Sequence, residues 1–189
     1  MARPKSEDKR NRLMAAATRV IAARGLSAPT AAIARAAGIS NGLLFTYFET
    51  KAELYNTLLL ELRSELAKAL LRGLPNKASQ RDQLSHLWGN WMRWATRYPE
   101  KRRVSELLAV SNEITPVTRA AVDQTMIEIM GITERARSKG PMQDAPLAFV
   151  TALLSAISDA TMNFIAENPG SADEVSLFGF DAVWRVLAG

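Results

Sequence analysis

The sequence predicts an all-α protein of nine helices. Apolar residues recur at the three- and four-residue spacing of a helix face through most of the 189 residues, and no segment alternates as a strand does. Glycine and proline residues, flanked by capping side chains, divide the chain into helical segments. We expect one domain at residues 1–52 and a second at residues 53–189, with the boundary inside a helix because no linker precedes Gly73.

The first helix is expected over residues 6–24, where Leu13, Ala17 and Ile21 share a face and Gly25 ends the segment. A hydrophobic content of 48% and this length are sufficient for a sizeable core. The chain is therefore expected to fold as a globular protein rather than to remain disordered.

A short second helix should follow. Ile33, Ala34 and Ala37 lie on one helix face, and the small alanines let two helices approach closely. Thr30 is expected to cap its N-terminus. Gly38 is expected to end it, because glycine readily adopts the left-handed conformation that follows many helices.

The third helix is expected over residues 41–48, with Ser40 as its N-cap and Ile39 at the corner between the two helices. Two short helices joined through a glycine turn form a helix-turn-helix, whose second helix enters the major groove of DNA. The alternative is a pair of amphipathic helices in an ordinary helical bundle.

The pattern that runs through this region consists of Thr30, Ile33, Ala34, Ala37, Gly38, Ile39, Ser40, Gly42, Tyr47, Phe48, Lys51 and Leu54. It resembles the signature of the TetR family of transcriptional regulators. The resemblance implies an N-terminal three-helix helix-turn-helix DNA-binding domain and a helical C-terminal domain for ligand binding and dimerisation. The number of expected helices also agrees with this family.

The resemblance further implies a set of DNA-binding residues: Thr30, Ser40, Asn41, Gly42, Leu43, Phe45, Thr46, Tyr47 and Lys51. Among them, Asn41 can form a bidentate hydrogen bond to adenine, and Gly42 allows a close approach to the groove. Tyr47 and Lys51 match the family's phosphate anchors. The amides at the start of the helix that follows Lys51 could also hold a phosphate.

Two positions depart from the family pattern. Leu43 stands where a small hydroxyl residue or alanine is usual, and Phe45 stands where tyrosine is usual. Both can make apolar contacts, for instance to thymine methyl groups. The departures leave DNA binding expected and the operator sequence unpredicted; core packing is the alternative role for Phe45.

The net charge of +5 is concentrated at this end of the chain. Residues 1–55 contain nine Lys or Arg and four Asp or Glu, whereas the remaining residues contain fifteen of each. A polyanionic partner such as double-stranded operator DNA is the simplest interpretation. The basic residues before Leu13 could form an arm that reaches phosphates, although a solubilising tail is the alternative.

Six further helices are expected at residues 51–72, 80–98, 99–112, 116–140, 146–168 and 172–187. Thr50 with Glu53 and Ser171 with Glu174 are expected to form capping boxes. The expected caps or openings of the fifth, seventh and eighth helices are Ser79, Thr115 and Asp144.

The helix at residues 80–98 concentrates large aromatic side chains that, together with methionines of the seventh helix, could line an adaptable apolar pocket. Plain core packing is the alternative. The candidate ligand-binding residues are Trp88, Trp91, Met92, Trp94, Tyr98, Met126, Met130, Ser158 and Asn163. Because residues 56–189 carry balanced charges, we expect a small, largely uncharged organic effector.

The last two helices are apolar on more than one face, so that one core cannot cover all of their apolar residues. The family's arrangement is a two-fold four-helix interface formed by these helices from both protomers. We therefore expect a homodimer. The candidate interface residues are Ala152, Ala156, Val175, Phe178, Val183 and Trp184.

Other protein classes lack support in the sequence. The absence of cysteine excludes disulfides, thiolate metal sites and cysteine nucleophiles. No paired carboxylates, catalytic triad or metal-ligand spacing is found, and His86 is the single histidine, so we expect no enzyme, cofactor or metal. We find no signal peptide, and the 14-residue uncharged run between Asp144 and Asp159 is too short to span a bilayer, so a cytoplasmic protein is expected.

The leading hypothesis is a dimeric, sequence-specific DNA-binding transcriptional regulator. In this family it would usually be a repressor that a small apolar or aromatic ligand releases from its operator. The alternative is a DNA-binding regulator without an effector, controlled by a protein partner. A helical enzyme is a third and less supported hypothesis.

Overall fold

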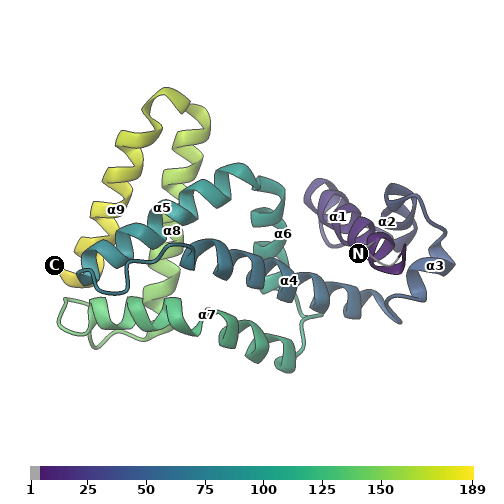
Figure 1. The fold of residues 1–189 in the computed structure, drawn as a ribbon, viewed down its shortest axis with the longest axis horizontal. Helices are drawn as coiled ribbons and strands as arrows, with labels where there is room; N and C mark the ends of the chain where they lie inside the picture. Colours follow the sequence, from purple (N-terminus) through teal and green to yellow (C-terminus); the bar gives the residue numbers. More distant parts are fainter. Residues whose placement is uncertain (1–4) are drawn as a thin grey trace. The chain divides into compact units, whose positions relative to one another are not determined.

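A computed structural model describes residues 5–189 of the chain. These residues form nine α-helices and one short 3-10 helix, with no strand among them (Figure 1). The elements are α1 (Lys5–Arg24), α2 (Thr30–Ala37), α3 (Asn41–Phe45), α4 (Lys51–Leu71), α5 (Gln80–Arg97), α6 (Pro99–Ala109), α7 (Pro116–Arg137), α8 (Leu147–Glu167), η1 (Pro169–Ser171) and α9 (Ala172–Ala188). The prediction of an all-α fold with nine helices is confirmed.

The chain forms two compact units. The first contains the residues up to Ser64 together with Tyr98–Gln124, and the second contains Glu65–Arg97 and Thr125–Gly189. Helix α6 and the start of α7 thus pack with the helix-turn-helix, whereas the sequence interpretation assigned them to the second domain. The functional boundary at residue 52 remains a prediction.

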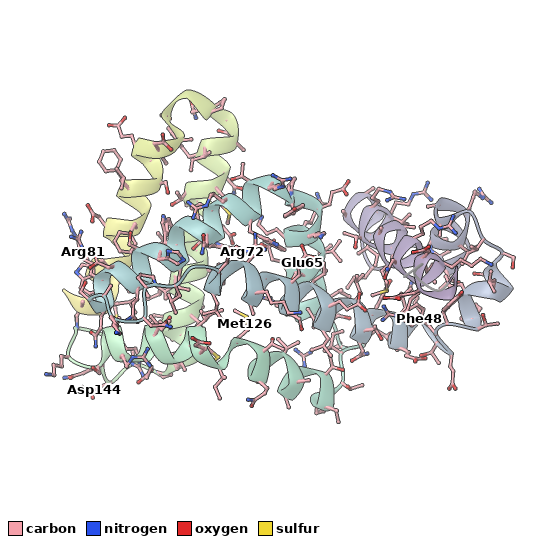
Figure 2. The ribbon with its side chains drawn as sticks, in the orientation of Figure 1. Phe48, Glu65, Arg72, Arg81, Met126 and Asp144 are labelled. Carbon is pink, nitrogen blue, oxygen red and sulfur yellow. The ribbon has the colours of Figure 1, made fainter. Side chains whose placement is uncertain are left out.

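The first unit has a core built mainly from α1, α2, α3 and α4. Leu13, Ile21, Ile33 and Leu44 are fully buried there, and Phe48 in the connection between α3 and α4 joins the same cluster (Figure 2). The helix faces predicted for α1 and α2 are therefore the buried ones.

A network of hydrogen bonds ties the α6–α7 connection to α4 within the same unit. The Asn56 side chain donates from Nδ2 to the Glu113 carbonyl at 2.8 Å and accepts from the Thr115 amide at 2.9 Å. The Arg119 guanidinium donates to two carbonyls at the end of α6. Because these carbonyls and amides would otherwise lack partners, Asn56 and Arg119 fix the path of the connection.

The second unit is held by contacts of α5 with α8 and α9. The Trp88 indole donates to the Ser176 carbonyl at 2.9 Å. Arg81 pairs with Asp181 at 2.8 Å and lies at the α5–α9 side of the unit (Figure 2). A Cβ at Gly179 would lie 2.7 Å from the Trp88 ring. The glycine therefore allows α9 to pack closely against α5.

A buried arginine organises the connection between α7 and α8. Arg137 Nη1 donates to the carbonyls of Met142, Gln143 and Ala145 at 2.6, 2.9 and 3.0 Å. Its Nε donates to Glu134 at 2.7 Å. A guanidinium carries five donors in a fixed plane, and here the two of Nη1 are shared among three carbonyls of one loop.

Several helix caps occur as predicted. Thr50 Oγ1 accepts from the Glu53 amide at 3.0 Å, Ser79 Oγ from the Asp82 amide at 3.2 Å, and Thr115 Oγ1 from the Thr118 amide at 3.2 Å. Each satisfies an amide that the helix itself leaves without a partner.

Three other predicted openings are wrong. Thr30 is the first residue of α2, and Pro29 occupies the N-cap position. Pro146, and not Asp144, is the N-cap residue of α8, which begins at Leu147. Ser171 makes no side-chain cap to α9; its hydroxyl donates to the Asn168 carbonyl at 3.0 Å within the short 3-10 turn.

Candidate functional site

The turn between α2 and α3 adopts the geometry that the sequence predicts. Gly38 has φ 70°, in the left-handed region that glycine enters without a Cβ clash. The amides of Gly38 and Ile39 donate to the carbonyls of Arg35 and Ala34 at 3.1 and 3.0 Å. These bonds close the end of α2 and set the direction in which α3 begins.

Helix α3 is shorter than predicted and ends at Phe45. Thr46 Oγ1 donates to the Leu43 carbonyl at 2.8 Å, and the amides of Tyr47 and Phe48 both donate to the Leu44 carbonyl. The chain turns here because Phe48, 3% exposed, enters the core. The Thr46 hydroxyl hydrogen is thereby engaged, which leaves its oxygen free to accept a hydrogen bond.

One face of α3 is anchored and the other is open. Leu44 is fully buried, and Ser40 Oγ accepts from the Leu43 amide at 3.1 Å, so Ser40 acts as the predicted cap. The opposite face presents four exposed candidate DNA-binding residues, Asn41, Gly42, Phe45 and Thr46, and Leu43 is half-buried. A rigid helix with an exposed amide and an exposed aromatic ring can read base edges directly.

The proposed phosphate anchor Lys51 also has a partner inside its own unit. Its Nζ donates to the Leu26 carbonyl at 2.8 Å and lies 5.3 Å from the centre of the Tyr55 ring. Tyr55 Oη donates to the same carbonyl at 2.6 Å. Burial, and then the Glu113 carboxylate, raises the pKa of Tyr55 to about 12, which keeps the phenol protonated as a donor at neutral pH.

The amides at the start of α4 are partly used within the protein. Thr50 accepts from the Glu53 amide, and the Glu53 carboxylate accepts from the Glu49 amide at 2.6 Å. The carboxylate therefore occupies part of the site that was expected to hold a phosphate. Tyr47, the other expected anchor, is half-buried against the core of the unit.

Basic side chains surround the helix-turn-helix. The exposed ones among the described residues of the first two helices are Lys9, Arg12, Arg19, Arg24 and Arg35. Arg10 instead pairs with Glu61 and lies over the Phe48 ring. Residues 5–12 belong to α1, so this part of the expected basic arm is helical; Arg3 lies outside the described residues.

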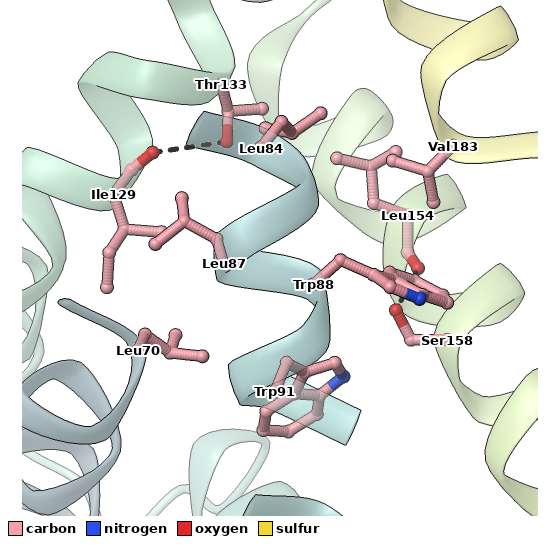
Figure 3. A pocket seen from close by; sticks show the side chains of 10 residues that line it. All are labelled: Leu70, Leu84, Leu87, Trp88, Trp91, Ile129, Thr133, Leu154, Ser158 and Val183. Carbon is pink, nitrogen blue, oxygen red and sulfur yellow. Dashed lines mark hydrogen bonds between the residues drawn. The ribbon is translucent and has the colours of Figure 1, made fainter. Parts of the chain in front are cut away.

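The second unit contains a cavity of about 150 Å3 between α4, α5, α7, α8 and α9 (Figure 3). Its apolar lining consists of Leu70, Leu84, Leu87, Trp88, Trp91, Ile129, Leu154 and Val183. Thr133 and Ser158 add two hydroxyl groups, and none of these ten described residues carries an ionisable side chain. The cavity suits a small apolar molecule.

The structure brings three of the nine predicted ligand-binding residues to this cavity: Trp88, Trp91 and Ser158. Met92 and Trp94 are buried, Met126 and Met130 are half-buried and Asn163 is exposed, and none of them lines the cavity. Tyr98 belongs to the first unit.

Sequence reasoning identified the two tryptophans on the face of α5 that lines the cavity and missed its two leucines. Leu84, Leu87, Trp88 and Trp91 follow the i, i+3, i+4, i+7 spacing of one helix face. The sequence interpretation selected large aromatic and methionine side chains of this helix and left its leucines out. A search for the longest apolar stripe, rather than the most aromatic one, could have identified the lining.

Helices α8 and α9 expose a large apolar surface. Phe149, Phe164, Leu177 and Phe178 are each at least half exposed, and Ala152 and Ala156 lie exposed between the first two. Of the predicted interface residues, Val175 and Trp184 are half-buried, and Val183 is buried and lines the cavity. Exposed apolar surface of this kind usually marks an interaction site.

Helix α8 is longer than the uncharged run within it that the sequence analysis compared with the thickness of a bilayer. The helix continues through Asp159 for 21 residues, whereas the uncharged run of 14 residues seemed too short to cross a bilayer. By length and composition, α8 could cross a membrane, and 28% of its most apolar window is buried within the described chain. Core helices of soluble proteins pass the same test, so the finding mainly shows how much apolar surface remains uncovered.

Comparisons with known proteins agree with this geometry. A TetR-family transcription regulator from Shewanella sp. PV-4 has 21% sequence identity and a TM-score of 0.83, over 96% of this chain and 98% of that one. One from Marinobacter aquaeolei VT8 has 21% identity and a TM-score of 0.80, over 99% of both chains. Residues 13–58 match the family model of bacterial regulatory proteins of the tetR family. The described chain therefore has the fold of solved TetR-family regulators, and its segment 13–58 is similar to the tetR family of bacterial regulatory proteins.

A third solved structure adds a ligand-bound relative. The transcriptional regulator FadR from Bacillus subtilis, in complex with stearoyl-CoA, has 18% identity and a TM-score of 0.66, over 94% of this chain and 97% of that one. The matched residues 13–58 extend from α1 into α4 and include the whole helix-turn-helix. The similarity to the tetR family model thus covers the segment that contains the exposed face of α3.

The first prediction concerns Gly42. A Cβ at this position meets nothing within 4 Å, and alanine is favoured over glycine in a helix by about 0.5–1 kcal/mol. Gly42→Ala should therefore leave the free energy of unfolding unchanged or raise it. It should weaken DNA binding by about 1–3 kcal/mol, because the methyl group occupies the space of a close contact.

Chemical denaturation and DNA titration measure the two effects. Gly170→Ala is a matched control, since its Cβ also meets nothing within 4 Å and the residue lies far along the chain, in η1. Unchanged DNA affinity of Gly42→Ala would show that no close approach occurs at this position.

The second prediction separates the two roles of Lys51. Lys51→Met keeps the apolar stem and removes the charge, so it should weaken binding to all DNA sequences alike and lower the salt slope by about one unit. Tyr55→Phe removes one hydrogen bond to Leu26 and no charge. It should cost about 0.5–1.5 kcal/mol of stability and leave the salt slope unchanged.

Both quantities come from DNA titrations at several salt concentrations together with denaturant unfolding. The alternative result is that Lys51→Met lowers the free energy of unfolding but leaves the salt slope of DNA binding unchanged. Lys51 would then stabilise the first unit and contact no phosphate.

Proposed function

We propose that the chain is a dimeric, sequence-specific DNA-binding transcriptional regulator, and that it is a repressor released from its operator by a small apolar or aromatic ligand. The observation that carries this proposal is the open face of α3 within a TetR-family helix-turn-helix. We place its action in the cytoplasm, where the DNA is accessible.

In the proposed complex, two copies place their α3 helices in successive major grooves about 34–36 Å apart. Asn41 is the residue best suited to read a base, since its amide can both donate to and accept from adenine. Leu43 and Phe45 would contact thymine methyl groups. The exposed Lys and Arg side chains of α1 and α2, together with Lys51, would neutralise phosphates. Tyr47 would donate a hydrogen bond to a phosphate.

Two observations support control by a ligand. The cavity of the second unit is apolar and has room for a small molecule, and the relative FadR was solved with stearoyl-CoA. A ligand that binds more tightly to a conformation with wider α3 spacing would shift the population away from the DNA-bound state.

A second candidate is control by a protein partner without any effector. Val110 and Val117 favour it, because they are 82% and 79% exposed on either side of the α6–α7 connection. Two such residues make a small patch, whereas the cavity offers a concave apolar site lined by ten residues, so ligand control remains the main proposal.

The third prediction tests sequence-specific binding. Selection of fragments bound by the purified chain from random DNA should return a palindromic site with two half-sites about one helical turn apart. Asn41→Ala should select a different base at one position of each half-site, because the bidentate contact is lost. If Asn41→Ala selects the same sequence, Asn41 does not read a base; if the unmodified chain enriches no sequence, the proposed function is wrong.

The fourth prediction tests the dimer. Phe178 is 64% exposed on α9, and a stable homodimer buries roughly 1,200–2,000 Å2 or more of largely apolar surface. Light scattering should therefore give twice the chain mass of 20.7 kDa at micromolar concentration. Phe178→Glu should shift the mass to that of one chain, because it buries an unpaired charge.

Val117→Glu serves as the control, since Val117 is similarly exposed but lies at the start of α7. A monomeric unmodified chain would contradict the proposed dimer, and so would a Phe178→Glu variant that remains dimeric.

A further inference from the structure

We propose that the cavity of the second unit binds a neutral, single-ring compound with one hydroxyl group, of the phenol class. The inference rests on the proposed ligand control, and names the chemistry of the effector. It follows from which hydrogen-bonding groups the cavity offers, from its lack of charge and from its size.

The two hydroxyl groups of the lining act toward a ligand as acceptors. Ser158 Oγ donates its hydrogen to the Leu154 carbonyl at 2.8 Å, and Thr133 Oγ1 donates to the Ile129 carbonyl at 3.1 Å (Figure 3). A hydroxyl has one hydrogen and two lone pairs. With the hydrogens directed to their own helices, the lone pairs are what remains for a molecule in the cavity, and they bind a group that donates.

The indole groups of the lining differ from each other. The Trp88 N–H is committed to the Ser176 carbonyl and hydroxyl, at 2.9 and 3.1 Å. The Trp91 N–H makes no hydrogen bond to the described residues, and Figure 3 shows its nitrogen on the ring edge that faces Ser158. A ligand hydroxyl can accept from Trp91 and donate to Ser158 at once, which a carbonyl or carboxylate cannot do.

The shape of the wall favours an aromatic ring. Trp91 stacks on Trp94 with centroids 5.8 Å apart and planes at 16°, so its ring is held in place as a flat surface. Aromatic rings pack well on such a surface in offset or edge-on geometry. A cavity of about 150 Å3 accommodates one benzene-sized molecule, which sets the ligand at one ring with small substituents.

The absence of charge in the lining excludes acidic and cationic ligands. None of the ten described lining residues is ionisable, and a carboxylate transferred there would lose its hydration and find no cation, with one neutral donor, the Trp91 N–H, in return. The stearoyl-CoA bound by FadR is both far too large for this volume and multiply charged, so the two proteins would take ligands of different chemistry.

The polar groups of the lining predict the opposite order of ligand affinities from that of a purely apolar cavity. If the cavity selected by apolarity alone, toluene would bind more tightly than 4-methylphenol, because the hydroxyl must be stripped of water. If Ser158 and Trp91 satisfy the hydroxyl, 4-methylphenol binds more tightly, since sites built for a hydroxyl discriminate against analogues that lack it.

Calorimetric titration of the full chain at pH 7 with 4-methylphenol, toluene and benzoate tests the proposal. We expect 4-methylphenol to bind one per chain and roughly tenfold more tightly than toluene, and benzoate to give no saturable binding. Toluene binding at least as tightly as 4-methylphenol, benzoate binding most tightly, or no saturable binding of 4-methylphenol would each overturn it.

Two variants locate the hydroxyl. Ser158→Ala removes the acceptor and Trp91→Phe removes the donor while it keeps an aromatic wall, so each should bring the ratio of toluene to 4-methylphenol dissociation constants close to one without weakening toluene. Ser155→Ala is the matched control, because Ser155 is exposed on the same helix and does not line the cavity. An unchanged ratio in both Ser158→Ala and Trp91→Phe would overturn the assignment.

A separate measurement distinguishes the ligand class from the proposed function. 4-methylphenol is added to the complex of the chain with its selected operator. Release of the DNA supports both proposals. Selective binding of 4-methylphenol without release supports the phenol class and contradicts ligand control, whereas release by benzoate or toluene but not by 4-methylphenol supports ligand control and contradicts the phenol class.

Discussion

The helix-turn-helix depends on one carbonyl oxygen. The Leu26 carbonyl, in the connection between α1 and α2, accepts hydrogen bonds from both Lys51 and Tyr55 of α4. Helix α3 has five residues, and isolated helices shorter than about 12–15 residues are marginal in water. Its shape therefore comes from its surroundings: the Leu26 contact aligns α4 with the α1–α2 connection, and burial of Leu44 then fixes α3 between them.

Local signals in the sequence predicted the buried helix faces of the first unit and several of the helix caps. Gly38 was predictable because a left-handed backbone is a property of one residue. The three wrong helix openings all adjoin a proline, at Pro29, Pro146 and Pro169. Proline presets its own φ and lacks an amide hydrogen, so it takes the N-cap or first-turn position in place of the nearby side chain that would otherwise cap the helix.

The cavity was harder to predict because the periodicity of apolar residues shows which residues share a helix face. It does not show which other helices pack against that face. Leu87 and Trp91 belong to a stripe of α5 that lines the cavity together with residues of α7 and α8. Trp94 is an equally apolar residue of the same helix, but it is buried, with 5% exposure, and does not line the cavity. Choosing between the stripes needs the positions of helices that are distant in sequence. The direction of the Ser158 hydroxyl hydrogen, on which the proposed ligand chemistry depends, is likewise visible only in three dimensions.

The exposed side of α3 also bears on how such a protein can diverge. Leu44 supplies the buried contact of the helix, and Asn41, Gly42, Phe45 and Thr46 contribute surface. Substitution at these four positions changes what the helix presents while the packing beneath it is preserved. Duplicated copies of the chain can therefore acquire different DNA preferences in single steps, without passing through poorly folded intermediates.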